Sequence, residues 1–230
     1  NPARQQWAAD LGIYNYDSYD AMLADEEVDI FSTLDDRFLA MPSFAVEKCK
    51  ELVCEMAKIS QDAYKLSISL IDKYSVEGFA EVQRMETLID KYEDKTSTYL
   101  VRIAENQMSA KDSKVVNELL HCVGDIERIS DHALNIAGYT EVIKNKSIEF
   151  SKGAKEEIEK MQQITELSLK TALDNNKERM DWLLEVEELE EQMDEMTNLY
   201  RERHLERMRK GECSEEACIL YSELLTDFER

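Results

Sequence analysis

Glycine and proline are scarce in this sequence. Only 6 glycines and 2 prolines occur among 230 residues, whereas ordinary proteins contain roughly 7% and 5% of these residues. Few positions can therefore form tight turns, which predicts long helices. Apolar residues recur at spacings of three and four, the pattern of amphipathic helices rather than the alternation of strands. We predict an all-α fold.

Positive charge is also in short supply. The chain has 28 Lys and Arg against 50 Asp and Glu, a formal net charge of −22. Nucleic-acid binding needs clustered Lys and Arg to neutralise phosphates, so the composition argues against a nucleic-acid partner. It argues equally against binding to an anionic membrane surface. Most of the acids are expected to form a solvated surface, and cations are the natural ligands of the rest.

Long apolar runs, a signal peptide and zinc-type cysteine spacings are all missing. No run approaches the roughly 18 apolar residues of a membrane helix, so we expect no membrane insertion by this chain. The odd number of cysteines without a CxxC motif predicts reduced thiols in a cytosolic setting. The five are Cys49, Cys54, Cys122, Cys213 and Cys218. Because the chain begins with Asn1 and stops inside a helical pattern, we expect a piece of a longer protein.

An internal repeat is the most informative feature that the sequence does contain. Glu86-Thr-Leu-Ile-Asp90 opens a helical stretch that ends at residues 125–137, with the sequence DIERISDHALNIA. Glu190-Glu-Gln-Met-Asp194 begins 104 residues after the first motif, and its stretch ends in mid-motif at residues 227–230. Such repeats indicate a duplicated structural unit.

The repeat predicts three segments. Residues 1–40 are acidic, rich in Tyr and Asp and without a counterpart, which indicates a linker with one short helix near residues 19–24. Residues 41–145 are predicted as a first three-helix bundle and 146–230 as a second, whose last helix is truncated, because each amphipathic helix must bury its apolar stripe against neighbours. The helices are predicted at about 43–73, 79–108, 113–144, 148–173, 178–209 and from 214 onward.

Carboxylates flank the predicted core stripes of the second and third helices. Glu86 and Asp90, together with Glu93, share a flank of the second helix, and Glu127 and Asp131 share a flank of the third. The two stripes are predicted as Val82, Met85, Ile89, Tyr92, Thr96, Leu100 and Ile103, and as Leu119, Cys122, Val123, Ile126, Ile129, Ala133 and Ala137.

Two acids four residues apart repel each other unless something positive lies between them. A hard divalent or trivalent cation, or a cluster of cations, suits oxygen ligands from two such pairs on neighbouring helices. A neighbouring basic side chain such as Arg128 is the alternative source of positive charge. Acids occupy about a fifth of the positions, so single pairs arise by chance. Recurrence of the pair in both repeats is what favours metal binding.

Histidine supports a competing hypothesis. Glu118-Leu-Leu-His121 has the Glu-x-x-His spacing of carboxylate-bridged di-iron bundles, which use this motif twice. The repeat places Glu223 where His121 would recur, so the second motif is missing and a di-iron oxidase is disfavoured. We predict that His121 and His132 are surface residues. Since no nucleophile, base or phosphate-binding glycine loop is recognisable, we predict that the chain is not an enzyme.

The segment 125–137, together with the motifs at 86–90 and 190–194, closely resembles the signature of PhoU, a bacterial phosphate-signalling family. The resemblance covers residues 45–230. In addition, residues 34–45 resemble the segment that introduces the PhoU-like domain of sodium/phosphate (Na/Pi) cotransporter family proteins, after their membrane helices.

The resemblance implies two three-helix bundles related by pseudo-twofold symmetry, with metal ions on the Glu-x-x-x-Asp motifs. Iron, zinc and magnesium are the candidate metals. The first site would consist of Glu86, Asp90, Glu127 and Asp131. Residues Glu190, Asp194 and Glu229 would contribute to the second, whose closing acid would lie beyond Arg230.

We therefore expect a regulatory domain that senses or relays phosphate status. Its expected partner is a membrane transporter domain of the same polypeptide or a transporter subunit, which places it on the cytoplasmic side of the plasma membrane. Homo-oligomer formation is left open. The alternative is a metal-free helical adaptor whose acids form a solvated face and whose partner is another protein.

Overall fold

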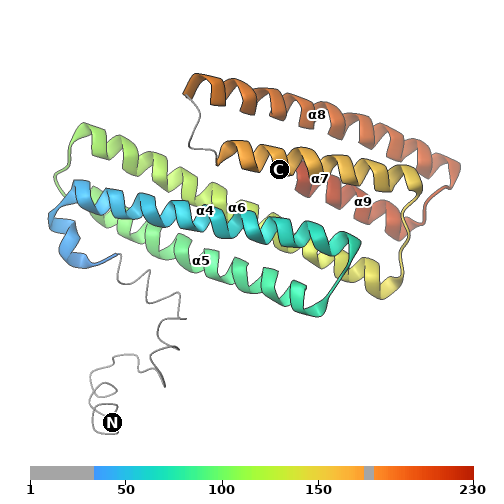
Figure 1. Cartoon of the computed structure of the whole chain (residues 1–230), viewed down its shortest axis with the longest axis horizontal. Helices are drawn as coiled ribbons and strands as arrows, with labels where there is room; N and C mark the ends of the chain where they lie inside the picture. The colour runs from blue at the N-terminus through green and yellow to red at the C-terminus, as the bar shows by residue number, and fades with distance from the viewer. Residues whose placement is uncertain (1–33, 174–178) are drawn as a thin grey trace, which may run out of the picture. The chain divides into compact units, whose positions relative to one another are not determined.

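The described chain is entirely helical. The structure is a computed structural model that describes residues 34–173 and 179–230; the predicted linker helix near residues 19–24 and the predicted turn at 174–177 lie outside these ranges. No strand occurs among the described residues, and the all-α prediction is confirmed. The elements, labelled in Figure 1, are η1 (Asp36–Ala40), α4 (Pro42–Asp72), α5 (Val76–Ala104), α6 (Ala110–Lys146), α7 (Lys152–Ala172), α8 (Arg179–Lys210) and α9 (Glu215–Glu229).

Within the described residues, six α-helices form two packed groups, as the prediction of tandem three-helix bundles requires. Helices α7, α8 and α9 pack against one another, most closely α7 against α8. Helices α4, α5 and α6 share an apolar cluster in which Leu70, Val82 and Ala137 are buried. No described helix is long and apolar enough to span a membrane.

Local sequence signals set the helix ends. Ser151 caps α7 by accepting a hydrogen bond from the amide of Ala154 (3.2 Å), and Ser214 caps α9 in the same way through Ala217 (3.2 Å). Gly211 has a φ of 67°, which suits the turn that ends α8. Four predicted boundaries are off by three or four residues. Helix α5 begins at residue 76 instead of 79 and ends at 104 instead of 108, and α6 begins at 110 instead of 113. Helix α7 begins at 152 instead of 148 because Ser151 supplies its cap.

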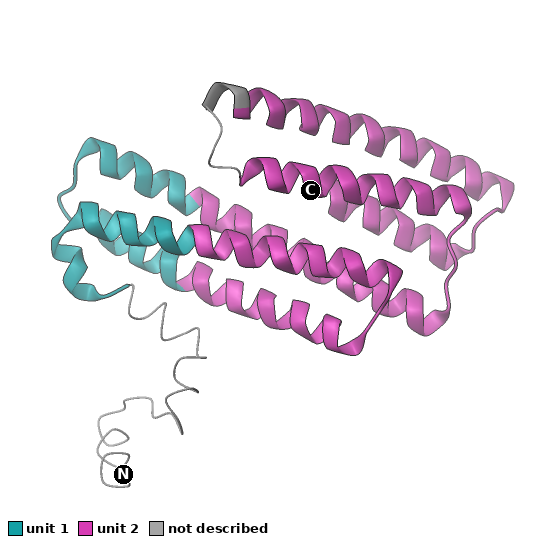
Figure 2. Cartoon of the chain, in the orientation of Figure 1, with its two compact units in different colours: residues 1–53, 95–120 teal, residues 54–94, 121–230 magenta. Residues whose placement is uncertain are grey.

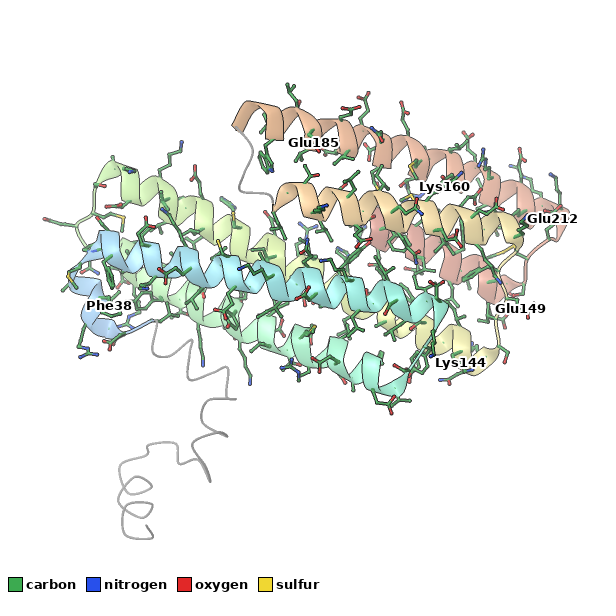
Figure 3. All side chains as sticks on the ribbon, viewed as in Figure 1. Phe38, Lys144, Glu149, Lys160, Glu185 and Glu212 are labelled. Carbon is green, nitrogen blue, oxygen red and sulfur yellow. A yellow bond between two sulfur atoms is a disulfide. The ribbon has the colours of Figure 1, made fainter. Side chains whose placement is uncertain are left out.

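A 3₁₀ helix, η1, lies at the end of the predicted linker, residues 1–40. The side chain of Asp35 caps η1 by accepting from the amide of Arg37 (2.8 Å). Tyr99 of α5 donates its hydroxyl proton to the carbonyl of Asp35 (2.7 Å), and the rings of Phe38 and Phe44 meet edge to face at 4.8 Å. Phe38 is labelled in Figure 3. Residues 34–40 are therefore part of the folded body.

The chain divides into two compact units, which Figure 2 colours separately. Unit 1 comprises the described residues up to Val53 together with Lys95–Leu120. Unit 2 comprises Cys54–Asp94 and His121–Arg230, and every predicted site residue lies in it. The predicted domain boundary at residues 145/146 stays a prediction.

Burial along α5 follows the predicted stripe, whereas α6 departs from it at one position. On α5, Met85 is partly buried and the other six predicted residues are buried. On α6, Cys122 is exposed, so its core assignment is wrong. Most buried residues of α6 instead follow alternating steps of three and four, which keeps one side of a long helix against its neighbours. These are Val116, Leu119, Val123, Ile126, Ser130, Ala133, Ala137 and Thr140, and Ile136 is buried beside them.

A buried charge network ties α7, α8 and α9 together. Glu157 of α7 is only 4% exposed. Its carboxylate accepts hydrogen bonds from Arg207 Nη2 of α8 (2.7 Å) and from the Tyr221 hydroxyl of α9 (2.5 Å), and Arg203 Nη1 lies 3.5 Å away. Glu157 is thus compensated by charge and by hydrogen bonds from two other helices, as a buried carboxylate must be.

Two of the cysteines contradict the prediction of reduced thiols. Cys213 and Cys218 form a disulfide, with their Cα atoms 6.2 Å apart. Cys213 directly precedes the Ser214 cap and Cys218 lies in the first turn of α9. Since helical side chains tilt toward the N-terminus, the thiol of Cys218 is directed back toward Cys213. Cys49, Cys54 and Cys122 take no part in a disulfide.

Candidate metal centre

Helices α5 and α6 bring the first predicted set of acids together. Glu86 and Asp90 lie one turn apart on α5, and Asp131 lies on α6. One carboxylate oxygen of each lies within 4.8 Å of the others. Glu86 is half-buried, while Asp90 and Asp131 are exposed. The two flanks predicted from the sequence therefore face each other.

Glu127, the fourth predicted residue, adjoins this group. Burial raises the pKa of Glu127, and the carboxylates of Asp131 and Asp90 raise it further, with a hydrogen bond to Asp131. Glu127 is therefore close enough to be influenced by both acids, although the set of three mutually close ligands comprises Glu86, Asp90 and Asp131.

The pKa values of Glu86 and Asp90 are raised as well. Burial raises the pKa of Glu86, with the carboxylates of Asp90 and Asp131 adding to the rise. Burial is also the first cause of the raised pKa of Asp90, followed by the carboxylates of Asp131 and Asp94. Glu86 and Asp90 thus resist ionisation because burial disfavours the charged form and neighbouring carboxylates add like charge, a condition that a bound cation would relieve.

The donor set suits a hard cation. Only carboxylate oxygens converge, and such ligands favour magnesium, calcium, manganese or ferric iron over softer ions that prefer sulfur or nitrogen. Among the candidate metals, magnesium and iron fit these ligands better than zinc, whose structural sites are built mainly from Cys and His. A bound cation would supply positive charge that holds α5 and α6 together at this face.

The second predicted set is arranged differently. Glu190 and Asp194 of α8 and Glu229 of α9 line one cavity of about 490 Å³. In the described part of the chain, their ligand atoms do not form a close group like that of the first set. Glu229 instead accepts a hydrogen bond from Arg201 Nη2 (2.9 Å). The three residues share a surface without converging.

His132 also lines this cavity, and its predicted surface position is wrong. It is 15% exposed, and its Nδ1 lies 2.7 Å from Oδ1 of Asp227 on α9, which is 7% exposed. Asn135 Nδ2 donates to the same oxygen (3.3 Å). His121, by contrast, is exposed as predicted.

Asp227 is held in its ionised form. Burial alone would raise the pKa of this carboxyl, but hydrogen bonds from His132, Tyr139 and Asn135 outweigh that effect and keep the pKa below its usual range. The sequence offered only a weak signal for this contact. In the repeat Asp227 corresponds to Asp125. Because Asp125 is exposed on α6, this correspondence does not indicate that Asp227 is buried.

Replacing His132 with alanine is expected to lower the free energy of unfolding by about 1–3 kcal/mol at pH 7, because Asp227 loses its main partner while staying buried. Urea denaturation measures the loss. His121→Ala, on the exposed side of the same helix, is the matched control and should change stability by less than about 0.5 kcal/mol. Equal losses in the two variants would contradict a structural role for the His132–Asp227 contact.

Comparisons with known proteins agree with this helical arrangement. Residues 53–140 match the PhoU domain family, and this segment contains all four acids of the first set. A protein of Aquifex aeolicus (strain VF5), named as a phosphate-specific transport system accessory protein PhoU homolog, is 34% identical over 93 residues. The aligned part covers 40% of this chain and 42% of that protein. No solved structure matches the chain.

The relative is named as an accessory protein of a transport system, which agrees with the prediction that the chain is not an enzyme. The resemblance to PhoU is confirmed for residues 53–140. Its extension to the rest of residues 45–230 and its cotransporter part stay predictions. Residues 53–140, which form most of α4, all of α5 and most of α6, are thus the part of the chain that is similar to the PhoU domain family.

Proposed function

We propose that this chain is a PhoU-type regulatory domain of phosphate transport, with a cation-binding face on α5 and α6. The observation that carries the proposal is the convergence of Glu86, Asp90 and Asp131 within the segment that matches the PhoU domain. The name of the Aquifex relative, an accessory protein of phosphate-specific transport, supports the phosphate connection.

In this proposal Glu86, Asp90, Glu127 and Asp131 hold one or more hard cations, and Glu127 completes the ligand set from the same face of α6. The raised pKa values of Glu86, Asp90 and Glu127 support it, because their shared repulsion is relieved when a cation binds. A second site formed by residues Glu190, Asp194 and Glu229 is part of the proposal. There the cavity supplies the space, and ligation would require Glu229 to leave Arg201.

The proposed partner is a sodium-dependent phosphate transporter, either a membrane domain of the same polypeptide or a separate subunit. This places the domain on the cytoplasmic side of the plasma membrane. The resemblance of residues 34–45 to the segment that precedes PhoU-like domains in cotransporters supports this context. Tethering would raise the local concentration at the membrane partner to about the millimolar range, so that even a weak contact would suffice.

Phosphate uptake by cells tests the proposal. The natural full-length protein is compared with a version that lacks residues 43–230 and with Asp90→Asn/Asp131→Asn. We expect the deletion to change the response of uptake to external phosphate, and the double variant to reproduce that change because it removes two central ligands.

Asp125→Asn, on the same helix but away from the acid group, is the control and should behave as wild type. If neither the deletion nor the double variant alters uptake or its response, the regulatory proposal is wrong. An effect of the deletion alone would instead support the metal-free adaptor.

A further inference from the structure

The turn between α8 and α9 holds a disulfide that is unrelated to the acidic face, the group formed by Glu86, Asp90, Glu127 and Asp131. Cys213 and Cys218 form a disulfide across the start of α9. Glu212, labelled in Figure 3, marks this turn. Cys213 is half-exposed, whereas Cys218 is 7% exposed. One sulfur is therefore accessible to an attacking thiol and the other is shielded.

Both cysteines border open space. They line a cavity of about 540 Å³ together with His204, Met208 and Ile219. Cys213 also lines a second cavity of about 700 Å³ with residues 146–149. A small thiol can thus approach Cys213 from either side of the turn.

The surroundings of Cys218 favour it as the leaving group. It lies in the first turn of α9, a helix of 15 residues, where the helix dipole favours a thiolate and opposes the negative charge of Glu215 and Glu216 in the same turn. A better leaving thiolate makes a disulfide easier to reduce. The bridge also closes a ring of only a few residues, so it constrains the unfolded chain less than a long-range bridge does.

The fold of α9 does not depend on this bridge. Ser214 caps the helix through the amide of Ala217 (3.2 Å), and Tyr221, Leu224 and Phe228 anchor it in the core. Opening the disulfide should therefore loosen the turn without releasing the helix. His204 of α8 reports on the change, because it lines the same cavity as both cysteines and stacks on Tyr221 with ring centroids 4.6 Å apart.

We infer that Cys213 and Cys218 are a reversible thiol–disulfide pair that controls the α8–α9 turn. The thiolate of a low-molecular-weight thiol attacks Sγ of Cys213, the S–S bond breaks, and Cys218 leaves as a thiolate that takes up a proton. A second thiol then attacks the mixed disulfide and releases Cys213 as a thiol. Two external thiols are oxidised to one disulfide, and the protein disulfide is reduced to two thiols.

Redox titration of the full chain in glutathione buffers tests the inference. Samples are acid-quenched, alkylated and analysed by peptide mass spectrometry. We expect the thiols of Cys213 and Cys218 to disappear together in one two-electron transition within the range of these buffers. Cys54, which is exposed and outside any disulfide, is the internal control and should form at most a mixed adduct with glutathione.

Three results would overturn the inference: a dithiol that persists in fully oxidised buffer, a disulfide that persists in fully reduced buffer, or glutathione adducts on Cys213 without the internal bridge. Hydrogen exchange supplies the conformational readout. Reduction should accelerate exchange several-fold in peptides covering residues 208–218 and leave α5 unchanged, and Cys213→Ser/Cys218→Ser should reproduce the reduced pattern. Unchanged exchange at the turn, or exchange that accelerates throughout the chain, would contradict a local switch.

Discussion

Replacing Glu157 with alanine is expected to lower the free energy of unfolding by about 3–5 kcal/mol, the largest stability effect predicted for this chain. The carboxylate is 4% exposed and is the shared acceptor for Arg207 and Tyr221. Its removal leaves the Arg207 side chain, 12% exposed, as a largely buried charge without its partner. The substitution therefore breaks contacts among three helices at once.

Urea denaturation measures the effect, and Glu159→Ala on the same helix is the control. Glu159 is exposed, so its substitution should change stability by less than about 0.5 kcal/mol. If Glu157→Ala does not fold, Glu157→Gln keeps the volume and one acceptor oxygen and should show a smaller loss. A loss below about 1 kcal/mol for the alanine variant would show that the network contributes little.

Asp90→Asn is expected to have opposite effects on stability in the absence and presence of a binding cation. In chelator, the substitution removes one of the mutually repelling charges of the acidic face, so the variant should unfold at a higher temperature than wild type. With the cation at about 100 times its dissociation constant, wild type gains about 2.7 kcal/mol, or roughly 5–10 °C for a chain of this size. The variant lacks a ligand and should lose most of that gain.

Thermal unfolding with and without the cation measures this crossover. Asp125→Asn, an exposed substitution of the same type on α6, should follow wild type in both conditions. If the unfolding temperature of Asp90→Asn is above that of wild type in both conditions, or below it in both, a cation on the acidic face is ruled out as the source of stabilisation.

The pH dependence of the cation-free protein follows from the same shifts. The folded-state pKa values of Glu86, Asp90 and Glu127 are raised, so the folded chain binds more protons than the unfolded chain between the ordinary and the raised values. The contribution of these groups to stability therefore falls as the pH rises through that window, and it recovers as the pH is lowered. Cation binding should flatten this part of the profile.

The sequence was sufficient to predict most of the fold because the relevant signals are local. The apolar spacing of α5 and the scarcity of glycine and proline gave the helices, and Gly211 marked the end of α8. The errors occur where a single side chain decides a boundary. Ser151 caps α7, so the helix begins later than the apolar pattern predicts. Asp35 caps a 3₁₀ helix that no apolar periodicity indicates.

The acidic face was predictable for a similar reason. Residues four apart on a helix share a side, so Glu86 with Asp90 and Glu127 with Asp131 could be paired without knowledge of the fold. The position of Asp227 could not be inferred in this way. Whether an acid at the end of α9 meets His132 or solvent depends on how α9 packs against α6, a property of tertiary contacts.

The buried network and the disulfide were missed because both join residues whose spacing has no recognisable pattern. Glu157 and Arg207 are 50 positions apart in the sequence. Cys213 and Cys218 are separated by 5 positions, a spacing typical neither of redox-active CxxC motifs nor of zinc sites. Their pairing depends on the cap at Ser214, which orients the first turn of α9 toward the preceding residue.

Metal content per chain tests the central claim most directly. Wild type, Asp90→Asn/Asp131→Asn and Asp125→Asn are each loaded with magnesium, manganese or ferric iron, desalted, and analysed by elemental mass spectrometry, with calorimetric titration for ions that exchange rapidly. The account predicts that wild type and Asp125→Asn bind at least one equivalent of a hard cation that the double variant fails to bind. Binding by the double variant equal to that of wild type, or no binding by wild type to any of these ions, would contradict it.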